Sequence, residues 1–343
     1  MRFHRPRALT TRPTVSVVVP CYNYGHYLPD AVASALDQEG LEVDVLIVDD
    51  ASPDDSARVA RKLAAADPRV DVLVHDVNAG HIRTYNDGLT KATGDYVVLL
   101  SADDQLPRNA LTRAVALMEH HPRVGLVYGH PATFETTPTP SQEEPRNWTV
   151  WSGREWLGAL VRRGGNVIMS PEVVLRREAW QQIGEYDARL PHSADLAAWL
   201  HTALRWDIGR VNGTDQAYYR VHGANMHLTT YAGMLVDLTE RRTTFELLMA
   251  EGDPLPADAR QLHARARAAL ASQARRLARE AAESPADRAA FLAFADETAG
   301  PLARRPRPSS SPVVLGGAIR SGRAARRRVR ETMRYHRWHR YGL

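Results

Sequence analysis

Two adjacent carboxylates, Asp103 and Asp104, follow the apolar run Tyr96 to Leu100 after only two residues in the stretch YVVLLSADD. Two like charges at the end of a buried strand repel each other, so the pair requires a counter-charge. A hard divalent cation such as Mg²⁺ or Mn²⁺ binds one or two carboxylates together with the oxygens of a diphosphate. The pair therefore predicts a site for a metal-bound diphosphate.

Polar residues also follow two other apolar runs, in PCYNYGH (20–26) and VDDASPDD (48–55). In an open parallel sheet, ligands bind beyond the carboxyl ends of the strands, so all three clusters are expected at one edge. Neither GxGxxG nor GxxxxGK[ST] follows the first run, which removes the main support for a dinucleotide site or a P-loop. A nucleotidyltransferase would need a glycine-rich, basic loop there, and CYNYGHYLPD has neither property.

The elements that position these clusters can be predicted from the hydrophobic pattern between residues 14 and 130. Strand-like runs occur at 14–20, 43–50, 69–75, 95–101 and 124–130. Segments with helical spacing lie between them, at 27–38, 52–66, 82–92 and 108–121. In the second of these, Ser52 is a candidate N-cap before Pro53. Strands that alternate with helices predict an α/β fold with a mostly parallel sheet buried on both faces.

The regular alternation ends after residue 130. A proline- and threonine-rich loop follows, then short strands and helices, and from Gly233 the pattern is helical. We therefore expect a basic N-terminal arm (1–13), an α/β domain (14–232), a helical segment (233–300) and a basic tail (301–343).

Charge is unevenly distributed along the 343 residues. The tail contains twelve arginines and one acid, Glu331, so its charge is +11, and the total of +4 leaves −7 for residues 1–300. Arginines mixed with Tyr335, Trp338 and Tyr341 predict contact with an anionic membrane surface. The acidic body argues against nucleic acid as a partner, because phosphate backbones require a positive surface.

The cellular compartment can also be predicted from composition. The single cysteine, Cys21, excludes an internal disulfide and fits a reducing compartment. The basic N-terminus lacks the apolar core of a secretory signal, and no apolar run reaches the length of a membrane span. We expect a cytoplasmic protein that is peripheral to the inner face of the membrane.

Four segments in this order resemble inverting glycosyltransferases of family 2, which have the GT-A fold. They are VSVVVPCYNYGHYLPDAVASAL, VLIVDDASPDDS, NAGHIRTYNDGLTKATGDYVVLLSADD and YYRVHGANMH, and they extend over residues 14–228. The resemblance implies a GT-A domain at 14–232 with a C-terminal helical extension. It also implies an enzyme that uses Mg²⁺ or Mn²⁺ and a UDP-, dTDP- or GDP-linked sugar. The acceptor would be a hydroxyl compound of unknown identity.

The resemblance further implies roles for individual residues. Asp104 would be a direct metal ligand, His222 a second metal or diphosphate contact, and Arg220 a phosphate contact. Asp195 would be the base that takes the proton from the acceptor hydroxyl. The nucleotide would be bound by Pro20, Tyr22, Asn23, Asp50, Asn78, Gly80, Arg83 and Asp103.

Several alternatives remain open from the sequence. Positions near Asp195 that often carry an acid in relatives are Ala194 and Ala197 here, which leaves Asp187 as a rival base. An acid in the first turn of a helix can also simply stabilise the helix dipole. The alternative function is a non-catalytic nucleotide-sugar-binding or scaffold protein. Aromatic side chains that fit either an acceptor groove or the core are those of Trp148, Trp151 and Trp156.

Overall fold

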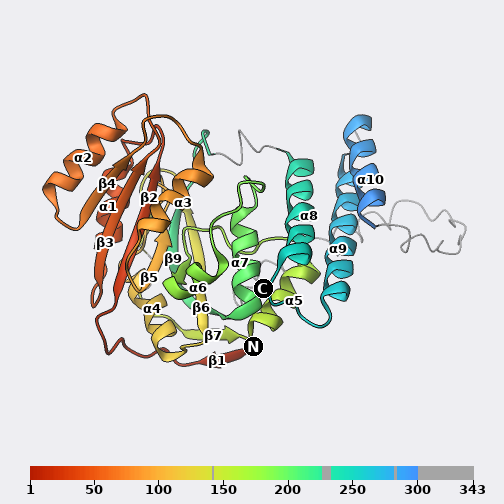
Figure 1. The fold of residues 1–343 in the computed structure, drawn as a ribbon, viewed down its shortest axis with the longest axis horizontal. Helices are drawn as coiled ribbons and strands as arrows, with labels where there is room; N and C mark the ends of the chain where they lie inside the picture. Colours follow the sequence, from red (N-terminus) through yellow and green to blue (C-terminus); the bar gives the residue numbers. More distant parts are fainter. Residues whose placement is uncertain (141–142, 226–232, 282–283, 300–343) are drawn as a thin grey trace, which may run out of the picture.

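The computed structural model describes residues 1–140, 143–225, 233–281 and 284–299. Within these residues the chain forms one nine-stranded sheet of order β1-β7-β9-β6-β8-β5-β2-β3-β4 (Figure 1). Seven strands point the same way, and β7 (Asn147–Trp151) and β8 (Val174–Arg176) run opposite to them. The expected α/β fold with a mostly parallel sheet is confirmed.

The first half of the chain builds the parallel part of the sheet, with helices packed against it. Its strands are β2 (Thr14–Cys21), β3 (Glu42–Asp49), β4 (Val70–Val74) and β5 (Tyr96–Leu99). The helices between and after them are α1 (Leu28–Leu36), α2 (Ser56–Ala66), α3 (His81–Lys91) and α4 (Ala110–His120). Gly88 lets α3 approach the sheet, because a Cβ there would lie 2.3 Å from Val18 Cγ1.

The start of α2 differs from the prediction. Ser52 does not cap the helix, because its hydroxyl accepts a hydrogen bond from Asn23 N at 3.0 Å and its N–H donates to Asp49 Oδ2 at 3.1 Å. Ser52 therefore ties the β3 turn to the β2 turn, and α2 begins four residues later at Ser56. Both turns lie at the edge of the sheet where the polar clusters gather.

The second half of the chain completes the sheet. The strands are β6 (Val124–Phe134) and β9 (Asp207–Arg220), which is one long strand where short ones were expected. The N-terminal arm adds β1 (Arg2–His4), which pairs with β7. Trp148, Trp151 and Trp156 are at most 2% exposed, so they belong to the core and are not available to stack on a sugar.

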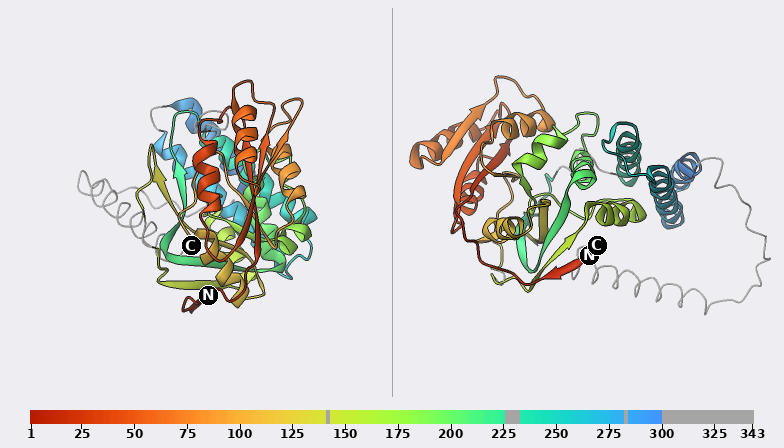
Figure 2. Two further views of the ribbon diagram at one scale, coloured as in Figure 1. Left: turned by 90° about the vertical axis from the view of Figure 1, so that its left-hand side faces the viewer. Right: turned by 60° about the horizontal axis from the view of Figure 1, so that its bottom comes forward.

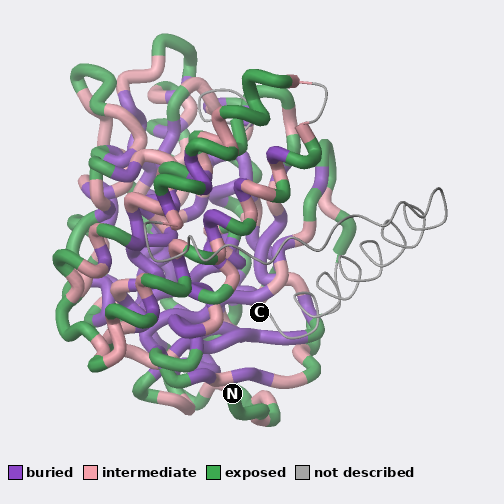
Figure 3. Tube along the Cα trace, turned by 90° about the vertical axis from the view of Figure 1, so that its right-hand side faces the viewer, coloured by how far each residue is buried: buried purple, intermediate pink, exposed green. Residues whose placement is uncertain are grey.

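The helical segment packs against the rest of the protein through a shared core. Its helices are α8 (Met234–Glu251), α9 (Ala259–Glu280) and α10 (Pro285–Ala299), which lie at the opposite end of the molecule from β2–β4 (Figures 1 and 2). One buried cluster joins them to the sheet and to α5 (Gly153–Arg163), α6 (Arg177–Ile183) and α7 (Ala194–Arg205). Figure 3 shows the buried and exposed parts of the chain, viewed from the side of Figure 1 on which α9 and α10 lie.

We predict that the helical segment unfolds together with the sheet. Leu270 in α9 is fully buried in the shared core, so Leu270→Ala should lower the free energy of unfolding by about 2–5 kcal/mol. Leu292→Ala, at a position 41% exposed in α10, is the matched control and should change it by less than about 0.5 kcal/mol. Calorimetry should give a single transition, whereas two separate transitions would contradict a shared core.

The described helices include none that is long and apolar enough to cross a membrane. The basic tail (301–343), on which the predicted contact with a membrane surface depends, lies outside the described residues.

Candidate functional site

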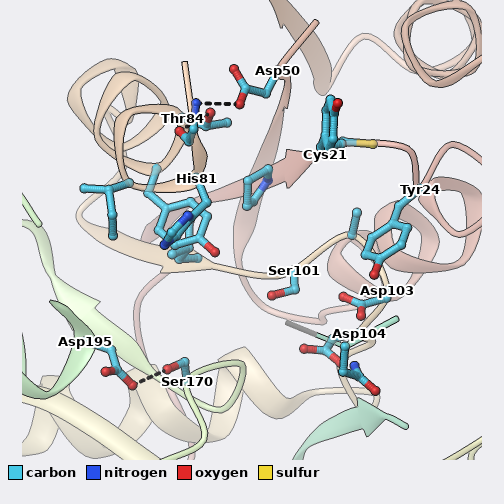
Figure 4. Close-up of a pocket in the computed structure, with 18 of the residues that line it drawn as sticks. Cys21, Tyr24, Asp50, His81, Thr84, Ser101, Asp103, Asp104, Ser170 and Asp195 are labelled. Atoms are coloured by element: carbon cyan, nitrogen blue, oxygen red, sulfur yellow. Dashed lines mark hydrogen bonds between the residues drawn. The ribbon is translucent and has the colours of Figure 1, made fainter. Parts of the chain in front are cut away.

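A cavity of about 680 Å³ lies at the carboxyl ends of β2, β3 and β5. It is lined by residues 20–24 at and after the end of β2, by Asp50 after β3 and by residues 101–104 after β5. Ser170, from the loop after α5, and Asp195, from α7, face the two carboxylates Asp103 and Asp104 across the cavity (Figure 4). The three polar clusters thus meet at one edge of the sheet, as parallel strands require.

The cavity has an unbalanced set of charged side chains. Its described lining contains four carboxylates, those of Asp50, Asp103, Asp104 and Asp195, and neither lysine nor arginine. A diphosphate placed here would be repelled by each of these groups in its ionised form. A bound cation removes that repulsion, because it is attracted to both the carboxylates and the phosphate oxygens.

Asp50 organises the rim of the cavity on the β3 side. Its carboxylate accepts hydrogen bonds from His75 Nδ1 at 2.8 Å, Ala79 N at 2.8 Å and Gly80 N at 2.9 Å. Burial by itself would raise the pKa of Asp50, but these hydrogen bonds outweigh it and lower the pKa below its usual value. Asp50 is therefore an ionised anchor that holds the loop containing Asn78 and Gly80 against the cavity.

Asp103 and Asp104 lie on a tight turn after β5. Asp104 is 2% exposed, and its Oδ1 accepts a hydrogen bond from Arg220 N at 2.9 Å. Asp103 Oδ2 lies 2.9 Å from His222 Nε2. Burial, and next the charge of Asp103, raise the pKa of Asp104 well above its usual range. A nearby cation would relieve both effects.

The residues present fit one kind of metal site. No group of three or more His, Cys, Asp or Glu side chains that could hold a metal is found in the part of the chain that the structure describes. This excludes an all-protein metal cage among those residues. Two neighbouring carboxylates do suit a Mg²⁺ or Mn²⁺ ion that obtains its other ligands from a diphosphate and water.

Arg220 lies behind the carboxylates and not in the cavity. Its guanidinium is sandwiched between the rings of Tyr27 and Phe134, at 4.5 and 4.4 Å from their centroids. It donates hydrogen bonds to Asp103 O at 2.8 Å and to Thr136 O at 3.1 Å. These contacts tie the end of β9 to the turn that carries Asp103 and Asp104.

Asp195 occupies the first turn of α7 and is held by three donors. Asn166 Nδ2 at 2.9 Å and Ser170 Oγ at 3.0 Å donate to its Oδ2, and Leu196 N at 2.6 Å donates to Oδ1. Burial raises the pKa of Asp195, and the hydrogen bonds from Leu196 and Ser170 oppose that shift without cancelling it. A carboxylate with a raised pKa is a better proton acceptor near neutral pH than an exposed one.

Asp187 has a different environment from Asp195. Both of its carboxylate oxygens accept hydrogen bonds from the Arg189 guanidinium, which also binds Glu251. The Arg189 hydrogen bonds lower the pKa of Asp187. Asp187 does not belong to the described lining of the cavity.

Residues 16–181 match the model of the family described as glycosyl transferase family 2. The chain carries a family 2 glycosyltransferase domain. The resemblance to family 2, which the sequence segments within this range carry, is thereby confirmed, and with it the enzyme class, a glycosyltransferase.

Sequence relatives support the same family. An uncharacterized glycosyltransferase of Nostoc sp. is 28% identical over 63% of this chain and 67% of that protein. The putative teichuronic acid biosynthesis glycosyltransferase TuaG of Bacillus subtilis is 34% identical over 31% of this chain. That second match spans only 42% of the length of TuaG, as does the match to an uncharacterized glycosyltransferase of Haemophilus influenzae.

Solved structures share the fold of this glycosyltransferase domain. TarS 1–349 of S. aureus in complex with UDP-GlcNAc superposes with a TM-score of 0.62 at 17% identity, over 82% of this chain and 79% of that one. The mannosyltransferase PcManGT of Pyrobaculum calidifontis, in complex with GDP-Man and Mn²⁺, superposes with a TM-score of 0.54 at 20% identity. That superposition covers 99% of this chain and 86% of PcManGT.

Most of the residues predicted for the glycosyltransferase site lie together. Those in the cavity lining are Pro20, Tyr22, Asn23, Asp50, Asn78, Gly80, Asp103, Asp104 and Asp195. Arg220 and His222 lie outside the lining, in contact with the turn that carries Asp103 and Asp104. Arg83 points away on the exposed face of α3, where its Nε is 2.8 Å from both carboxylate oxygens of Asp87.

Other lining residues were not predicted from the sequence. They are chiefly Tyr24 in the turn after β2, His81 at the start of α3, and Met169, Ser170, Tyr186 and His192, which belong to loops that do not follow a strand. His81 bridges two sides of the cavity, since its Nε2 lies 2.8 Å from Pro191 O. Beneath the same wall Glu172 is 2% exposed, and burial raises its pKa to about 7. Its position in the plain segment MSPEVV carries no sequence signal.

Proposed function

We propose that this glycosyltransferase is metal-dependent and inverting. It would transfer a sugar from a UDP-, dTDP- or GDP-linked donor to an acceptor hydroxyl, with Asp195 as the base and Asp104 as a metal ligand. The observation that carries the metal requirement is the cavity lining, with four carboxylates and no lysine or arginine among the described residues. A doubly charged leaving group needs a positive counter-charge there.

Asp103 and Asp104 would hold the cation. His222 and Arg220 would support them from outside the cavity, through their contacts with the turn that carries both carboxylates. A Mg²⁺ or Mn²⁺ ion supplies electrostatic stabilisation of the departing nucleoside diphosphate. The nucleoside would bind between Tyr22, on one side of the cavity, and the loop that Asp50 anchors, on the other.

The protein's own part in the chemistry would be proton transfer. The acceptor oxygen forms a bond to the anomeric carbon, the bond from that carbon to the diphosphate oxygen breaks, and the electron pair leaves with the nucleoside diphosphate. The acceptor proton passes to Asp195. The position of Asp195 across the cavity from Asp103 and Asp104 supports attack from the face opposite the leaving group, and hence inversion (Figure 4).

The names of relatives guide the choice of donor and product. TarS is recorded with UDP-GlcNAc and PcManGT with GDP-Man and Mn²⁺, and TuaG is named for teichuronic acid biosynthesis. We therefore extend the proposal to a cell-surface polysaccharide or a related glycoconjugate as product. Synthesis at the inner face of the membrane would suit the basic tail.

Nucleotide binding tests this proposal directly. Calorimetric titration of UDP, dTDP and GDP should detect binding of one nucleotide in the presence of Mn²⁺. Without the metal, binding should weaken by at least about 2 kcal/mol, roughly 30-fold. Equal affinity with and without Mn²⁺ would contradict the metal requirement, and no binding of any nucleotide would contradict the proposed donor class.

A further inference from the structure

Ser170 has a backbone conformation that is unfavourable for a residue with a side chain. Its φ is +87°, in the left-handed region, where a Cβ meets the neighbouring carbonyl oxygen. Glycine adopts this conformation without that penalty. The backbone conformation alone would favour glycine here, so the presence of a serine needs a separate explanation.

The strained conformation is held from both sides. Met169 N donates a hydrogen bond to Glu172 Oε1 at 2.8 Å, and Val173 N donates to Ser170 O at 3.0 Å. Because Glu172 is buried and β8 begins immediately afterwards, the turn cannot relax easily. Strained residues that are fixed in this way are concentrated at functional sites.

The side chain of Ser170 gives that explanation. Its hydroxyl donates to Asp195 Oδ2 at 3.0 Å across the wall of the cavity (Figure 4). Asn166 Nδ2 donates to the same oxygen, so two donors occupy Oδ2. Oδ1 accepts only from Leu196 N within the described ranges. Since a carboxylate oxygen has two acceptor sites, an accepting position remains on Oδ1.

We propose that Ser170 is a positioning residue whose hydroxyl fixes the Asp195 carboxylate so that Oδ1 receives the proton of the acceptor. This inference rests on the proposed role of Asp195 as base. The proton moves from the acceptor hydroxyl to Oδ1, while Oδ2 keeps its two hydrogen bonds. The strain at Ser170 is retained because glycine, which would relieve it, has no hydroxyl.

Two variants of the full-length protein separate the hydroxyl from the backbone strain. Ser170→Gly removes both, and Ser170→Ala removes only the hydroxyl. Turnover is measured as nucleoside diphosphate released from UDP-GlcNAc, GDP-Man and dTDP-glucose with water as the acceptor. Thermal unfolding, calorimetric nucleotide binding with Mn²⁺ and the pH profile of turnover are measured alongside.

We expect both variants to lose about 10- to 100-fold in turnover, the range for a lost hydrogen bond to a charged group. The acid limb of their pH profiles should move to higher pH, because Asp195 has lost a donor that stabilises its ionised form. Nucleotide affinity should not change. The Tm of Ser170→Gly should be above that of Ser170→Ala, because glycine relieves the strain at positive φ that alanine retains.

Two results would overturn the proposal. One is wild-type turnover and pH profile in Ser170→Gly, which would mean that the backbone path alone matters. The other is a loss of turnover in both variants that is no larger than their lowered Tm accounts for. Asp195→Asn, run in parallel, isolates the underlying assignment: if it retains turnover, the proposed base is wrong, whereas an inactive Asp195→Asn with a normal Ser170→Gly rejects the positioning role alone.

A second measurement decides the matter even if water proves too poor an acceptor. The carboxyl carbon of Asp195 can be titrated by ¹³C NMR and assigned by its absence in Asp195→Asn. Ser170→Gly should raise the pKa of Asp195, and an unchanged pKa would reject the positioning role.

Discussion

Asp195→Asn should reduce turnover about 10²- to 10⁴-fold, the range that a positioned general base contributes. Nucleotide affinity in the presence of Mn²⁺ should stay the same, because Asp195 lies across the cavity from Asp103 and Asp104 (Figure 4). Steady-state release of nucleoside diphosphate, together with calorimetric binding, measures both quantities on the same protein.

Asp187→Asn is the matched control, because Asp187 is the other acid considered as the base. It lies outside the described lining, and its hydrogen bonds go to Arg189. Its replacement should change turnover little. A large loss of turnover in Asp187→Asn with a normal Asp195→Asn would exchange the two assignments. If the wild type binds the donor but Asp195→Asn behaves as the wild type does in every turnover assay, the non-catalytic nucleotide-sugar-binding alternative is favoured.

The pH dependence of turnover should follow from the environment of Asp195. Burial raises its pKa, so the carboxylate is protonated at pH values where an exposed aspartate is still ionised. Turnover should therefore fall, as pH is lowered, at a pH above the usual aspartate value of about 3.9. Asn166, Ser170 and Leu196 all donate hydrogen bonds to the carboxylate, and an amide keeps only one of its two accepting oxygens. The Tm of Asp195→Asn is therefore measured with its turnover, and turnover that is lost at a temperature well below that Tm is not a consequence of unfolding.

The parallel part of the fold was predictable because its signals are local. β-Branched runs such as TVSVVVP and VDVLIVDD specify buried strands, and parallel strands necessarily bring their carboxyl ends to one edge. Asp50, Asp103 and Asp104 each follow such a run directly, which is why the donor side of the cavity could be derived from the sequence.

The opposite wall of the cavity was not predictable in this way. Ser170 and Asn166 belong to a loop whose path depends on α5 and β8, and contacts between them and Asp195 span 25 and 29 residues. The strain at Ser170 is a property of the backbone that cannot be predicted from the residue type. The tryptophans near residue 150 were ambiguous for the same reason, since only the packing of the fold shows Trp151 and Trp156 to be buried in one core cluster and Trp148 in another.

The arginines illustrate a further limit of sequence reasoning. A cation near a predicted phosphate site is an obvious candidate contact, but charge alone does not specify direction. Arg83 is paired with Asp87 four residues away on the same helix, and Arg220 is enclosed by Tyr27 and backbone carbonyls. The counter-charge for a diphosphate must then come from a source other than these two guanidinium groups as they are placed here.

Asp104→Asn should abolish Mn²⁺-dependent nucleotide binding and at the same time stabilise the metal-free protein. The amide can still accept the hydrogen bond from Arg220 N, so the turn should keep its shape. Binding is lost because a neutral amide is a much weaker ligand for a hard cation than a carboxylate. Calorimetric titration with the nucleotide that the wild type binds, with Mn²⁺ present, measures this effect.

The stability effect follows from the raised pKa of Asp104. Burial and the neighbouring charge of Asp103 make the ionised carboxylate unfavourable in the folded state, so above the usual aspartate pKa the folded wild type either bears the cost of that charge or takes up a proton, and the amide avoids both. Each kcal/mol gained should raise the Tm by about 1–2 °C for a protein of this length. Asp71→Asn, at an exposed position in β4, is the control and should change neither binding nor Tm. A variant that lost both binding and stability would mean that Asp104 has a structural role, whereas lost binding with a higher Tm assigns its charge to the metal.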